Sequence, residues 1–284
     1  MSDTLKAQVR EKYGRAATRA AAGQRSSCCG ATSAKASCCD PITTNLYDGR
    51  EAAEVPTEAL QASLGCGNPT ALAELRPGET VLDLGSGGGI DVLLSARRVG
   101  PEGMAFGLDM TDEMLSLAED NRRRSGLTNV RFLKGDIEHI PLPANSVDVI
   151  ISNCVINLAA DKDLVLEEAF RVLKPGGRFA VSDVIVHGEV PASLSDNADL
   201  WTGCVAGALS DREYLDKLAN AGFSEVGIEE TRRYSADDAR AFLAVDGIDA
   251  DTLAAEMDGT FASAFVRARK PAACCAPGCC EAGA

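Results

Sequence analysis

The chain has 284 residues, 45% of them hydrophobic, with a formal net charge of −14 and a pI near 4.6. This length and composition can bury a full core, which excludes a chain that is disordered throughout. The negative charge repels phosphate backbones and anionic lipid surfaces, so we expect neither nucleic acid nor a membrane as a partner.

The N-terminal sequence and the cysteine count bear on the cellular compartment. Met1–Lys6 lacks an apolar stretch of signal-peptide length, and no run approaches the roughly 20 apolar residues that span a bilayer. We therefore expect a cytoplasmic protein whose thiols stay reduced. The count of 11 cysteines is odd, which also argues against a disulfide framework.

The N-terminal part begins with a helical pattern and then loses it. Leu5–Ala22 has helix-forming composition and no proline, which predicts a helix. Tyr13-Gly14 within it either folds over a cofactor as an N-terminal lid or belongs to a helix that packs on the domain. Gln24–Asp48 is rich in Ser, Ala, Thr and Cys and is broken by Asp40-Pro41, so it predicts a mobile cysteine-bearing segment.

From Thr80 onward, short apolar runs alternate with helical stretches. The expected strands are Val81–Leu84, Met104–Leu108, Val130–Leu133, Val147–Ser152 and Phe179–Ile185, and the expected helices between them are Asp91–Val99, Asp112–Arg124 and Lys162–Leu173. Strands separated by helices of this length imply parallel βαβ units. They predict an open α/β sheet that binds its ligand at the carboxyl ends of the strands.

The C-terminal part is shorter and more mixed. Beyond Pro191 we expect two more helical stretches, a strand near Glu225–Glu229 and a final apolar strand at Phe261–Arg267. The sequence thus divides into an N-terminal helix with a Cys-rich segment (1–54), a cofactor-binding domain (55–190), a smaller C-terminal α+β part on the substrate side (191–270) and a Cys-rich flexible tail (271–284).

A glycine loop follows the first expected strand, in Val81–Asp91 (VLDLGSGGGID). Glycines let the backbone approach a ligand closely, and the helix that follows presents free N–H groups. Asp109 stands twenty residues after Gly89, where a carboxylate can bind both ribose hydroxyls. A dinucleotide site would look similar. The G-x-G-x-G spacing and the preceding Asp83 suit S-adenosylmethionine instead, because this ligand lacks a pyrophosphate and carries a cationic amino-acid end. Asp136, after the third strand, is then the natural acceptor for the adenine amino group.

The cysteines fall into two kinds. Cys66, Cys154 and Cys204 stand singly in ordered-looking sequence, whereas the other eight form adjacent pairs near the chain ends, at Cys28-Cys29, Cys38-Cys39, Cys274-Cys275 and Cys279-Cys280. For a lone cysteine, a small buried hydrophobe is the ordinary interpretation. Cys154 is the exception, because it follows the carboxyl end of the fourth strand, beside the expected cofactor.

Six motifs together carry a family resemblance: Leu64–Pro69 (LGCGNP), Leu82–Gly87 (LDLGSG), Leu108–Thr111 (LDMT), Ile151–Leu158 (ISNCVINL), Leu173–Arg178 (LKPGGR) and Gly203–Ala208 (GCVAGA). The chain resembles the arsenite methyltransferases, a family of class I S-adenosylmethionine-dependent enzymes, over roughly Tyr47–Phe223. The Lys-Pro-Gly-Gly turn is common to many class I methyltransferases. The motifs around Cys154 and Cys204 are far more selective.

The resemblance implies a Rossmann-like class I methyltransferase sheet with a Cys-rich N-terminal segment and a smaller C-terminal α+β part. It implies that Cys66, Cys154 and Cys204 are catalytic and hold trivalent arsenic. A fourth, N-terminal cysteine also takes part in this family: Cys38 or Cys39 lies nearest to the domain, and Cys28 or Cys29 stays open. The residues expected to bind the cofactor are Asp83, Gly85, Ser86, Gly87, Asp91, Asp109, Met110, Asp136, Ile137 and Asn153.

The implied reaction is detoxifying methylation of arsenite and methylarsenite, with S-adenosylmethionine as methyl donor and thioredoxin or glutathione as thiol reductant. Thiolate chemistry agrees independently, because soft sulfur ligands suit trivalent arsenic without any histidine. The sequence has only His139 and His187. Zinc commonly recruits Cys or His at short spacings, and the three single cysteines are too dispersed to show that signature.

Two other classes of function share part of this pattern. A class I methyltransferase of a small organic substrate, such as a quinone precursor, would have the same glycine loop and Asp109 but gives no reason for Cys154 and Cys204. A non-enzymatic thiol protein that binds metalloids would explain the cysteine pairs but not the cofactor loop. Formation of methylated arsenic from arsenite, with a quinone precursor as competitor, separates the three.

Overall fold

The computed structural model describes residues 2–22, 55–61, 65–190, 194, 204–242 and 250–272. The predicted Cys-rich segment at Gln24–Asp48 and all four cysteine pairs lie outside the described residues. Among the helices that are described, none combines the length and the apolar character needed to cross a membrane.

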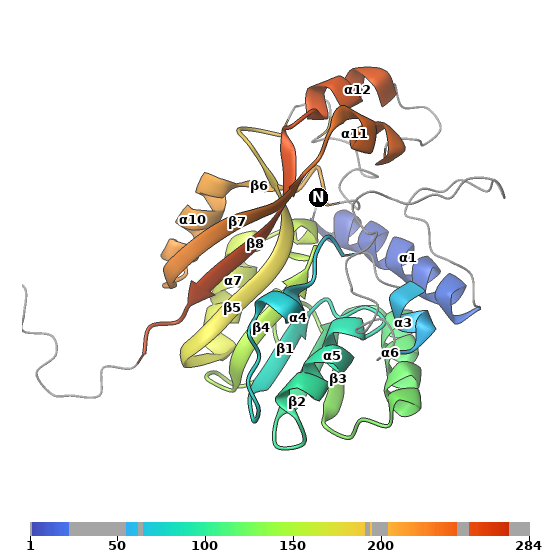
Figure 1. Cartoon of the computed structure of the whole chain (residues 1–284), viewed down its shortest axis with the longest axis vertical. Helices are drawn as coiled ribbons and strands as arrows, with labels where there is room; N and C mark the ends of the chain where they lie inside the picture. The colour runs from blue at the N-terminus through green and yellow to red at the C-terminus, as the bar shows by residue number, and fades with distance from the viewer. Residues whose placement is uncertain are drawn as a thin grey trace, which may run out of the picture.

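The described strands form one eight-stranded sheet in the order β3-β2-β1-β4-β5-β8-β7, with β6 paired to β5 (Figure 1). The parallel strands are β3 (Val130–Lys134), β2 (Met104–Asp109), β1 (Thr80–Leu84), β4 (Val147–Asn153), β5 (Leu173–Val186) and β6 (Leu209–Ser210). Antiparallel β8 (Phe261–Arg269) pairs with β5, and β7 (Ser224–Arg233) pairs with β8.

Helices cover both faces of the sheet. They are α1 (Ser2–Ala21), α3 (Thr57–Gln61), α4 (Pro69–Leu72), α5 (Ile90–Val99), α6 (Asp112–Ser125), the 3₁₀ turn η1 (Ile156–Leu158), α7 (Lys162–Val172), α10 (Asp211–Asn220), α11 (Ala236–Phe242) and α12 (Ala250–Met257). In Figure 1, α4 and α5 lie in front of the sheet and α7 behind it, while α1 packs beside α6.

Side chains alternate between two apolar layers along the central strands. Leu82 and Ile150 point into the layer that contains α7 and α10 residues, whereas their neighbours Val81, Val149 and Ile151 point into the layer shared with α4 and α5. All five are fully buried. Burial on both faces explains why these strands read as nearly continuous apolar runs.

Polar caps set where two of the helices begin. Asp161 accepts a hydrogen bond from the backbone N–H of Leu164 at 3.0 Å at the start of α7. At the start of α10, Ser210 and Glu213 form a capping box in which each side chain accepts from the other residue's backbone N–H. These bonds satisfy N–H groups that the first helical turn cannot pair internally.

The predicted strands and the predicted helices up to residue 173 are confirmed, with shifts at their ends. The Lys174–Gly177 turn, however, lies within β5, because Leu173 already pairs with Val147 and the next pair is Val149 with Arg178. The four residues between form a bulge rather than a separate loop. After residue 191 the described residues include α10, α11 and α12, so the expectation of two helical stretches was wrong.

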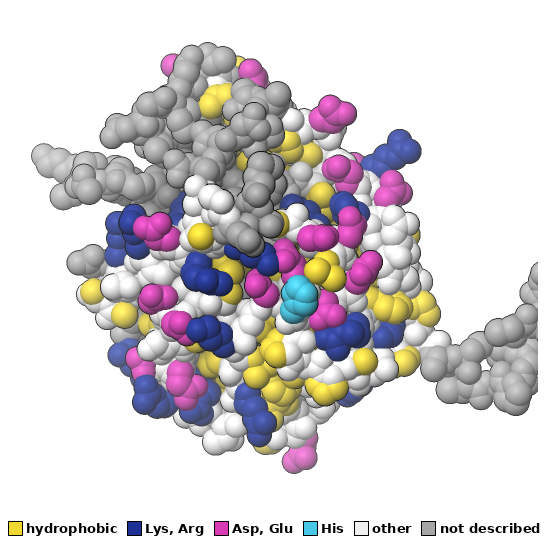
Figure 2. Space-filling view, turned by 180° about the vertical axis from the view of Figure 1, so that it is seen from behind, with side chains coloured by type: hydrophobic (Ala, Val, Ile, Leu, Met, Phe, Trp, Pro, Cys, Tyr) yellow, Lys and Arg dark blue, Asp and Glu magenta, His cyan; other side chains and the backbone are white. Residues whose placement is uncertain are grey.

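The C-terminal strands β7 and β8 extend the same sheet rather than forming a sheet of their own. This follows from the apolar sequence of β8, whose residues Phe261–Val266 are all buried between β5 and β7. The sheet therefore crosses the proposed division between 55–190 and 191–270, which stays a prediction. Figure 2 shows acidic and basic side chains interspersed over one face of the molecule.

Candidate active site

The carboxyl ends of β1 and β4 meet where the chain order of the sheet reverses. From β1 the chain proceeds outward to β2 and β3, and it then returns to place β4 on the other side of β1. Open α/β sheets bind ligands in the crevice at such a switch point. A pocket lies there, lined by Asp83 of β1, Asp109 of β2 and Asn153 of β4.

All ten residues expected to bind the cofactor line this one pocket. They come from the ends of three strands, the glycine loop, the start of α5 and the turn after β3: Asp83, Gly85, Ser86, Gly87, Asp91, Asp109, Met110, Asp136, Ile137 and Asn153. The sheet brings them together because parallel strands end at a common edge. Their role toward a cofactor stays a prediction.

The glycine loop is held against β2 by Asp109. One carboxylate oxygen of Asp109 accepts from the backbone N–H of Gly87 at 2.9 Å, and the other accepts from the N–H of Thr111 at 2.8 Å. Gly85 has φ +68°, and a Cβ there would lie 2.5 Å from the methyl carbons of Val155. Only glycine fits that position, so the loop keeps its path close to the pocket.

Five carboxylates line the pocket, and three of them, Asp83, Asp91 and Asp109, lie close together and favour a cationic ligand. Burial raises the pKa of Asp83 well above its usual range, and the charges of Asp91 and Asp109 raise it further. Burial also raises the pKa of Asp109, although hydrogen bonds from Thr111 and Gly87 oppose the shift. A positive charge placed among them relieves both the burial cost and the repulsion.

The pocket also offers an unmet hydrogen bond. The hydroxyl of Ser86 is buried and finds no hydrogen-bond partner among the described residues. Buried polar atoms are normally paired, so an orphan at a pocket wall indicates a place for a polar ligand group. The carboxylates, the glycine loop and this hydroxyl fit a ligand that is cationic at one end and polar along its length, as S-adenosylmethionine is.

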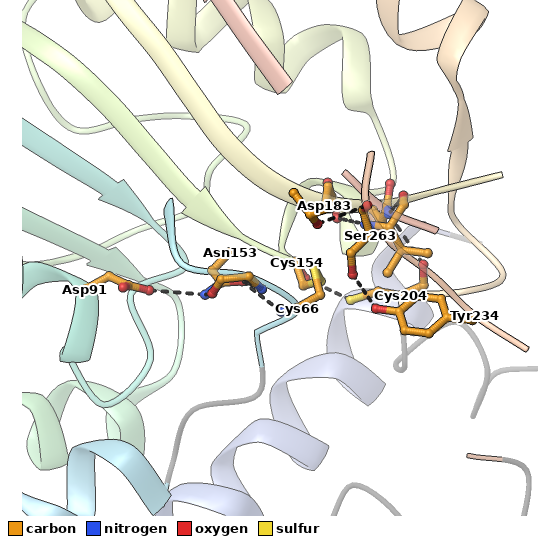
Figure 3. The surroundings of a disulfide bond; sticks show 12 residues. Cys66, Asp91, Asn153, Cys154, Asp183, Cys204, Tyr234 and Ser263 are labelled. Atoms are coloured by element: carbon orange, nitrogen blue, oxygen red, sulfur yellow. Dashed lines mark hydrogen bonds between the residues drawn. A yellow bond between two sulfur atoms is a disulfide. The ribbon is translucent and has the colours of Figure 1, made fainter. Parts of the chain in front are cut away.

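The three single cysteines lie together next to this pocket. Cys66 and Cys154 form a disulfide with Cα atoms 5.8 Å apart, and the Cys204 thiol donates to the carbonyl oxygen of Cys154 at 2.8 Å (Figure 3). All three are buried in one apolar cluster with residues of β5, β8 and α12. Pocket and cluster adjoin, because Gly65 and Asn153 line the pocket and directly precede Cys66 and Cys154.

The expectation that the thiols stay reduced was therefore wrong for one pair. Cys66 and Cys154 are 88 residues apart in the chain, so the cysteine count could not reveal that they meet. They meet because the loop before α4 crosses the carboxyl end of β4. Cys204 forms no disulfide within the described residues, while the eight cysteines in adjacent pairs, Cys38 and Cys39 among them, lie outside those residues.

Two of these cysteines have an uncommon backbone. Cys154 has φ +59° and Cys204 has φ +67°, in the left-handed region that non-glycine residues rarely adopt. Such a conformation costs on the order of 1 kcal/mol and persists where surrounding structure enforces it, often at functional sites. The turn at Cys154 ends β4 and directs the sulfur toward Cys66.

A buried carboxylate completes the cysteine site. One oxygen of Asp183 on β5 and the sulfurs of Cys66 and Cys154 all lie within 4.8 Å of one another. The Tyr214 hydroxyl donates to Asp183 at 3.1 Å. Burial raises the pKa of Asp183 to about 7, against the hydrogen bond from Tyr214 and other lowering contacts. Its carboxyl therefore changes protonation near neutral pH.

Comparison with known proteins places the chain in a family. A family model described as a methyltransferase domain matches residues 75–222. The chain belongs to this methyltransferase family. The match covers the glycine loop, the five pocket carboxylates, Cys154 and Cys204, and it confirms the expected Rossmann-like fold class.

This methyltransferase is 41% identical over 274 residues to a curated arsenite methyltransferase of Halobacterium salinarum, an alignment that covers 93% of this chain and 66% of that protein. It also resembles the crystal structure of an arsenic(III) S-adenosylmethionine methyltransferase from Chlamydomonas reinhardtii, with 33% identity and a TM-score of 0.63, over 81% of this chain and 73% of that one. The predicted resemblance to arsenite methyltransferases is confirmed.

Two further comparisons show how much of each relative the similarity covers. The chain spans 56 to 66% of the length of the curated arsenite methyltransferases that it matches. A ubiquinone/menaquinone biosynthesis C-methyltransferase of Vibrio vulnificus is 43% identical over 108 residues, which is 37% of this chain and 41% of that protein. The similarity to the quinone enzyme thus extends over a much smaller part of the methyltransferase.

Sequence reasoning missed most of what α1 contributes to the pocket. Lys6, Val9 and Tyr13 line it, and Tyr13 also packs against the cysteine cluster, as expected for a helix residue that packs on the domain. A role of Tyr13-Gly14 as a lid over the cofactor stays a prediction. Lys6 forms ion pairs with Glu138 and, at 3.4 Å, with Asp136. Burial lowers the Lys6 pKa, but these carboxylates raise it more, and the net shift is upward. The sequence feature that could have revealed this packing is the spacing of Val9, Tyr13 and Ala17, which puts these three residues on one face of the helix.

Asp183 was also missed. It lies in an apolar strand where a single carboxylate looks like an edge residue, yet it is almost completely buried. Only the fold places it against Cys66 and Cys154, because those residues come from two other segments of the chain.

Proposed function

We propose that this methyltransferase transfers a methyl group from S-adenosylmethionine to trivalent arsenic held by Cys66, Cys154 and Cys204. The observation that carries the proposal is the contact between a buried cluster of three cysteines and a carboxylate-lined pocket at the switch point of the sheet. The similarity to proteins named arsenite methyltransferases supports it.

The donor pocket is assigned from the groups that line it. Asp83 and Asp91 are placed to balance the positive amino-acid end of S-adenosylmethionine, and Asp109 to accept from its ribose hydroxyls. Asp136 and Ile137 would border the adenine. When bound there, S-adenosylmethionine supplies an electrophilic methyl group. The chain's own contribution is to align this group with the arsenic and to exclude water.

The cysteine cluster suits a neutral substrate. Arsenite near pH 7 is uncharged As(OH)₃, so it enters an apolar cluster without the cost of burying a charge. Each thiol replaces one hydroxide: the S–H proton joins the departing hydroxide as water while an As–S bond forms. Sulfur ligation leaves the arsenic lone pair free to attack the methyl carbon. The methyl transfer itself requires no general base.

The Cys66–Cys154 disulfide fits the redox part of the cycle. After methylation the arsenic is formally pentavalent. Two cysteine sulfurs that leave it as a disulfide return two electrons, which restores trivalent arsenic. The arsenic then keeps its methyl group and Cys204, and water supplies a hydroxide as third ligand and releases one proton. An external thiol, such as glutathione or thioredoxin, then reduces Cys66–Cys154 with two electrons and two protons and readies the site for another turnover. The α+β part from residue 191 to 270 contributes Cys204 to the substrate side.

Trivalent arsenic with one methyl group has only two valences left for sulfur. The monomethyl intermediate therefore needs two cysteines, for which we assign Cys154 and Cys204. Cys66 then serves the first methylation and the disulfide step. The quinone-precursor alternative has no use for any of the three thiols.

The test is a direct assay on the full chain. Arsenite, S-adenosylmethionine with an isotopically labelled methyl group and excess glutathione are incubated with the protein, and arsenic species are separated by chromatography and identified by mass spectrometry. A quinone precursor is added in parallel as competing acceptor. Labelled methylarsenic is the expected product. Label in the quinone alone, or arsenic that is bound but never methylated, overturns the proposal in favour of one of the two alternatives.

A further inference from the structure

The side chain of Asn153, the last residue of β4, holds the loop that carries Cys66. Its Oδ1 accepts from the backbone N–H of Cys66 at 2.8 Å and of Gly67 at 3.1 Å, and its Nδ2 donates to the Gly67 carbonyl oxygen at 2.7 Å. Nδ2 also lies 3.3 Å from a carboxylate oxygen of Asp91, and Figure 3 shows the amide between Asp91 and Cys66. Bonds to two successive residues fix both the position and the direction of the loop.

The glycines on either side of Cys66 permit this close approach. A Cβ at Gly65 would lie 2.2 Å from Cγ of Asn153, and a Cβ at Gly67 would lie 2.5 Å from Oγ of Ser182. Side chains do not fit at such distances, so the loop reaches β4 and β5 only with glycine at both positions. The Gly-Cys-Gly sequence is thereby explained by contacts on both sides of the cysteine.

The partner cysteine is anchored on the same residues. Cys154 directly follows Asn153, and its backbone N–H donates to the Ser182 carbonyl oxygen at 2.8 Å. The two sulfurs therefore sit on backbone segments that are both fixed against Asn153 and Ser182. Two thiols held in this way have a high effective concentration toward each other.

We propose that Asn153 is a positioning residue that sets the Cys66 sulfur within bonding reach of the Cys154 sulfur, in addition to lining the donor pocket. The property that it controls is the equilibrium in which the two thiols react with glutathione disulfide to give the Cys66–Cys154 disulfide and two molecules of glutathione. This equilibrium involves no arsenic, so the inference stands or falls independently of the proposed substrate.

The experiment measures that equilibrium constant in the full chain. Protein is equilibrated in glutathione buffers of known ratio, quenched with acid, and its thiols are alkylated before and after reduction with light and heavy reagents. Mass spectrometry of the peptides that contain Cys66 and Cys154 reads this pair separately from the other nine cysteines. The variants are Asn153→Ala, Gly65→Ala, the double variant, and the control Asn129→Ala.

Asn129→Ala is a matched control, because its buried amide donates to the carbonyl oxygens of Ala96 and Gly100 at 2.9 and 2.8 Å, at the other end of α5. Asn153→Ala is expected to lower the equilibrium constant about tenfold, the scale of losing one to two hydrogen bonds. Gly65→Ala should lower it by a similar factor, because the added methyl group pushes the loop off the amide. The double variant should fall no further, since Asn153→Ala makes room for that methyl group.

The control should stay within about twofold of the parent even if its melting temperature falls. An unchanged constant in folded Asn153→Ala, together with weaker binding of S-adenosylhomocysteine by calorimetry, would mean that Asn153 serves only the donor pocket and would overturn the inference. An equal fall in Asn129→Ala would reduce the effect to general stability and would overturn it as well. If Asn153→Ala does not fold, a parental constant in folded Gly65→Ala overturns the inference in its place.

Discussion

The donor pocket and the cysteine site adjoin each other but are built in opposite ways. The pocket gathers buried carboxylates and a polar loop from the carboxyl ends of neighbouring strands and the start of α5. The cysteine site gathers thiols from three distant segments inside an apolar cluster, with Asp183 beside them. Under the proposed function, the difference teaches that one region selects a charged ligand by electrostatics, whereas the other selects its ligand by the softness of sulfur.

The largest effect should come from the cysteine site alone. Cys154→Ser and Cys204→Ser should each lose methylation of both arsenite and trivalent monomethylarsenic, by more than the roughly 10- to 100-fold that loss of an outer partner of a metal site costs. Serine keeps the size of the side chain but offers a hard, poorly ionised oxygen. Product formation is measured under excess glutathione, with S-adenosylhomocysteine affinity as control. Activity within tenfold of the parent in either variant would remove that cysteine from the site.

Cys66→Ser should affect methylation of the two arsenic substrates differently. It is expected to lose methylation of arsenite, which needs three sulfurs, and to keep methylation of trivalent monomethylarsenic, which needs two. Each substrate is assayed separately with external thiols supplying the reduction. Arsenite methylation at the parent rate would make Cys66 a structural cysteine and the three-thiol site wrong.

Asp109→Ala tests the other region. Removing a carboxylate that fixes the glycine loop and is placed to accept from ribose hydroxyls should weaken donor binding by about 2 kcal/mol, or roughly 30-fold. Calorimetry with S-adenosylmethionine measures the change, and the Cys66–Cys154 equilibrium should stay at the parent value. Unchanged affinity in a folded variant would refute the assignment, and a shift in both readouts would show that the two regions are not separable.

Asp183, which is buried beside the cysteines, should make the free energy of unfolding depend on pH. Its pKa is about 7 in the folded protein and near its usual value of 3.8 when unfolded, so the native state binds the extra proton between these values. Its contribution to the free energy of unfolding is therefore present at low pH and is lost as pH rises through about 7.

Asp183→Asn should remove this loss, so that the variant gains on the parent by about 3 kcal/mol between pH 5 and pH 8. Urea unfolding of both proteins, under the same reducing conditions, measures the difference. Parallel pH profiles for parent and variant would show that Asp183 is ionised in the folded protein across that range, as it is in the unfolded chain, and would contradict the raised pKa.

The smallest effect is expected from the C-terminal cysteine pairs, which lie outside the described residues. Removing everything after Lys270 should leave turnover at saturating arsenite within a few-fold of the parent, because an Ala-Gly-Pro-Cys sequence beyond the last strand carries no fixed role in our assignment. Thermal unfolding controls for the integrity of β8. A loss of turnover beyond tenfold in a folded truncation would bring these cysteines into the reaction.

The sequence by itself determined the parallel sheet and the ten predicted pocket residues, but not those of α1. Strand and helix periodicity located the elements up to residue 173. Asp83, Asp109 and Asp136 lie at or just after the carboxyl ends of their strands, so local order in the chain is enough to place them at one edge. Irregularities inside a strand were harder to predict from the sequence. Lys174–Gly177 has the composition of a turn but forms a bulge in β5, because pairing with β4 continues on both sides of it.

Only the tertiary structure decided the pairing of Cys66 with Cys154, the burial of Asp183 beside them and the attachment of the Cys66 loop to Asn153. These contacts join segments far apart in the chain. They form because the loop before α4 crosses β4, and because β5 pairs with β8 and contacts α10. No local sequence pattern encodes this arrangement. The sequence shows which residue types can carry out a given chemistry, but tertiary packing decides which neighbours they act with.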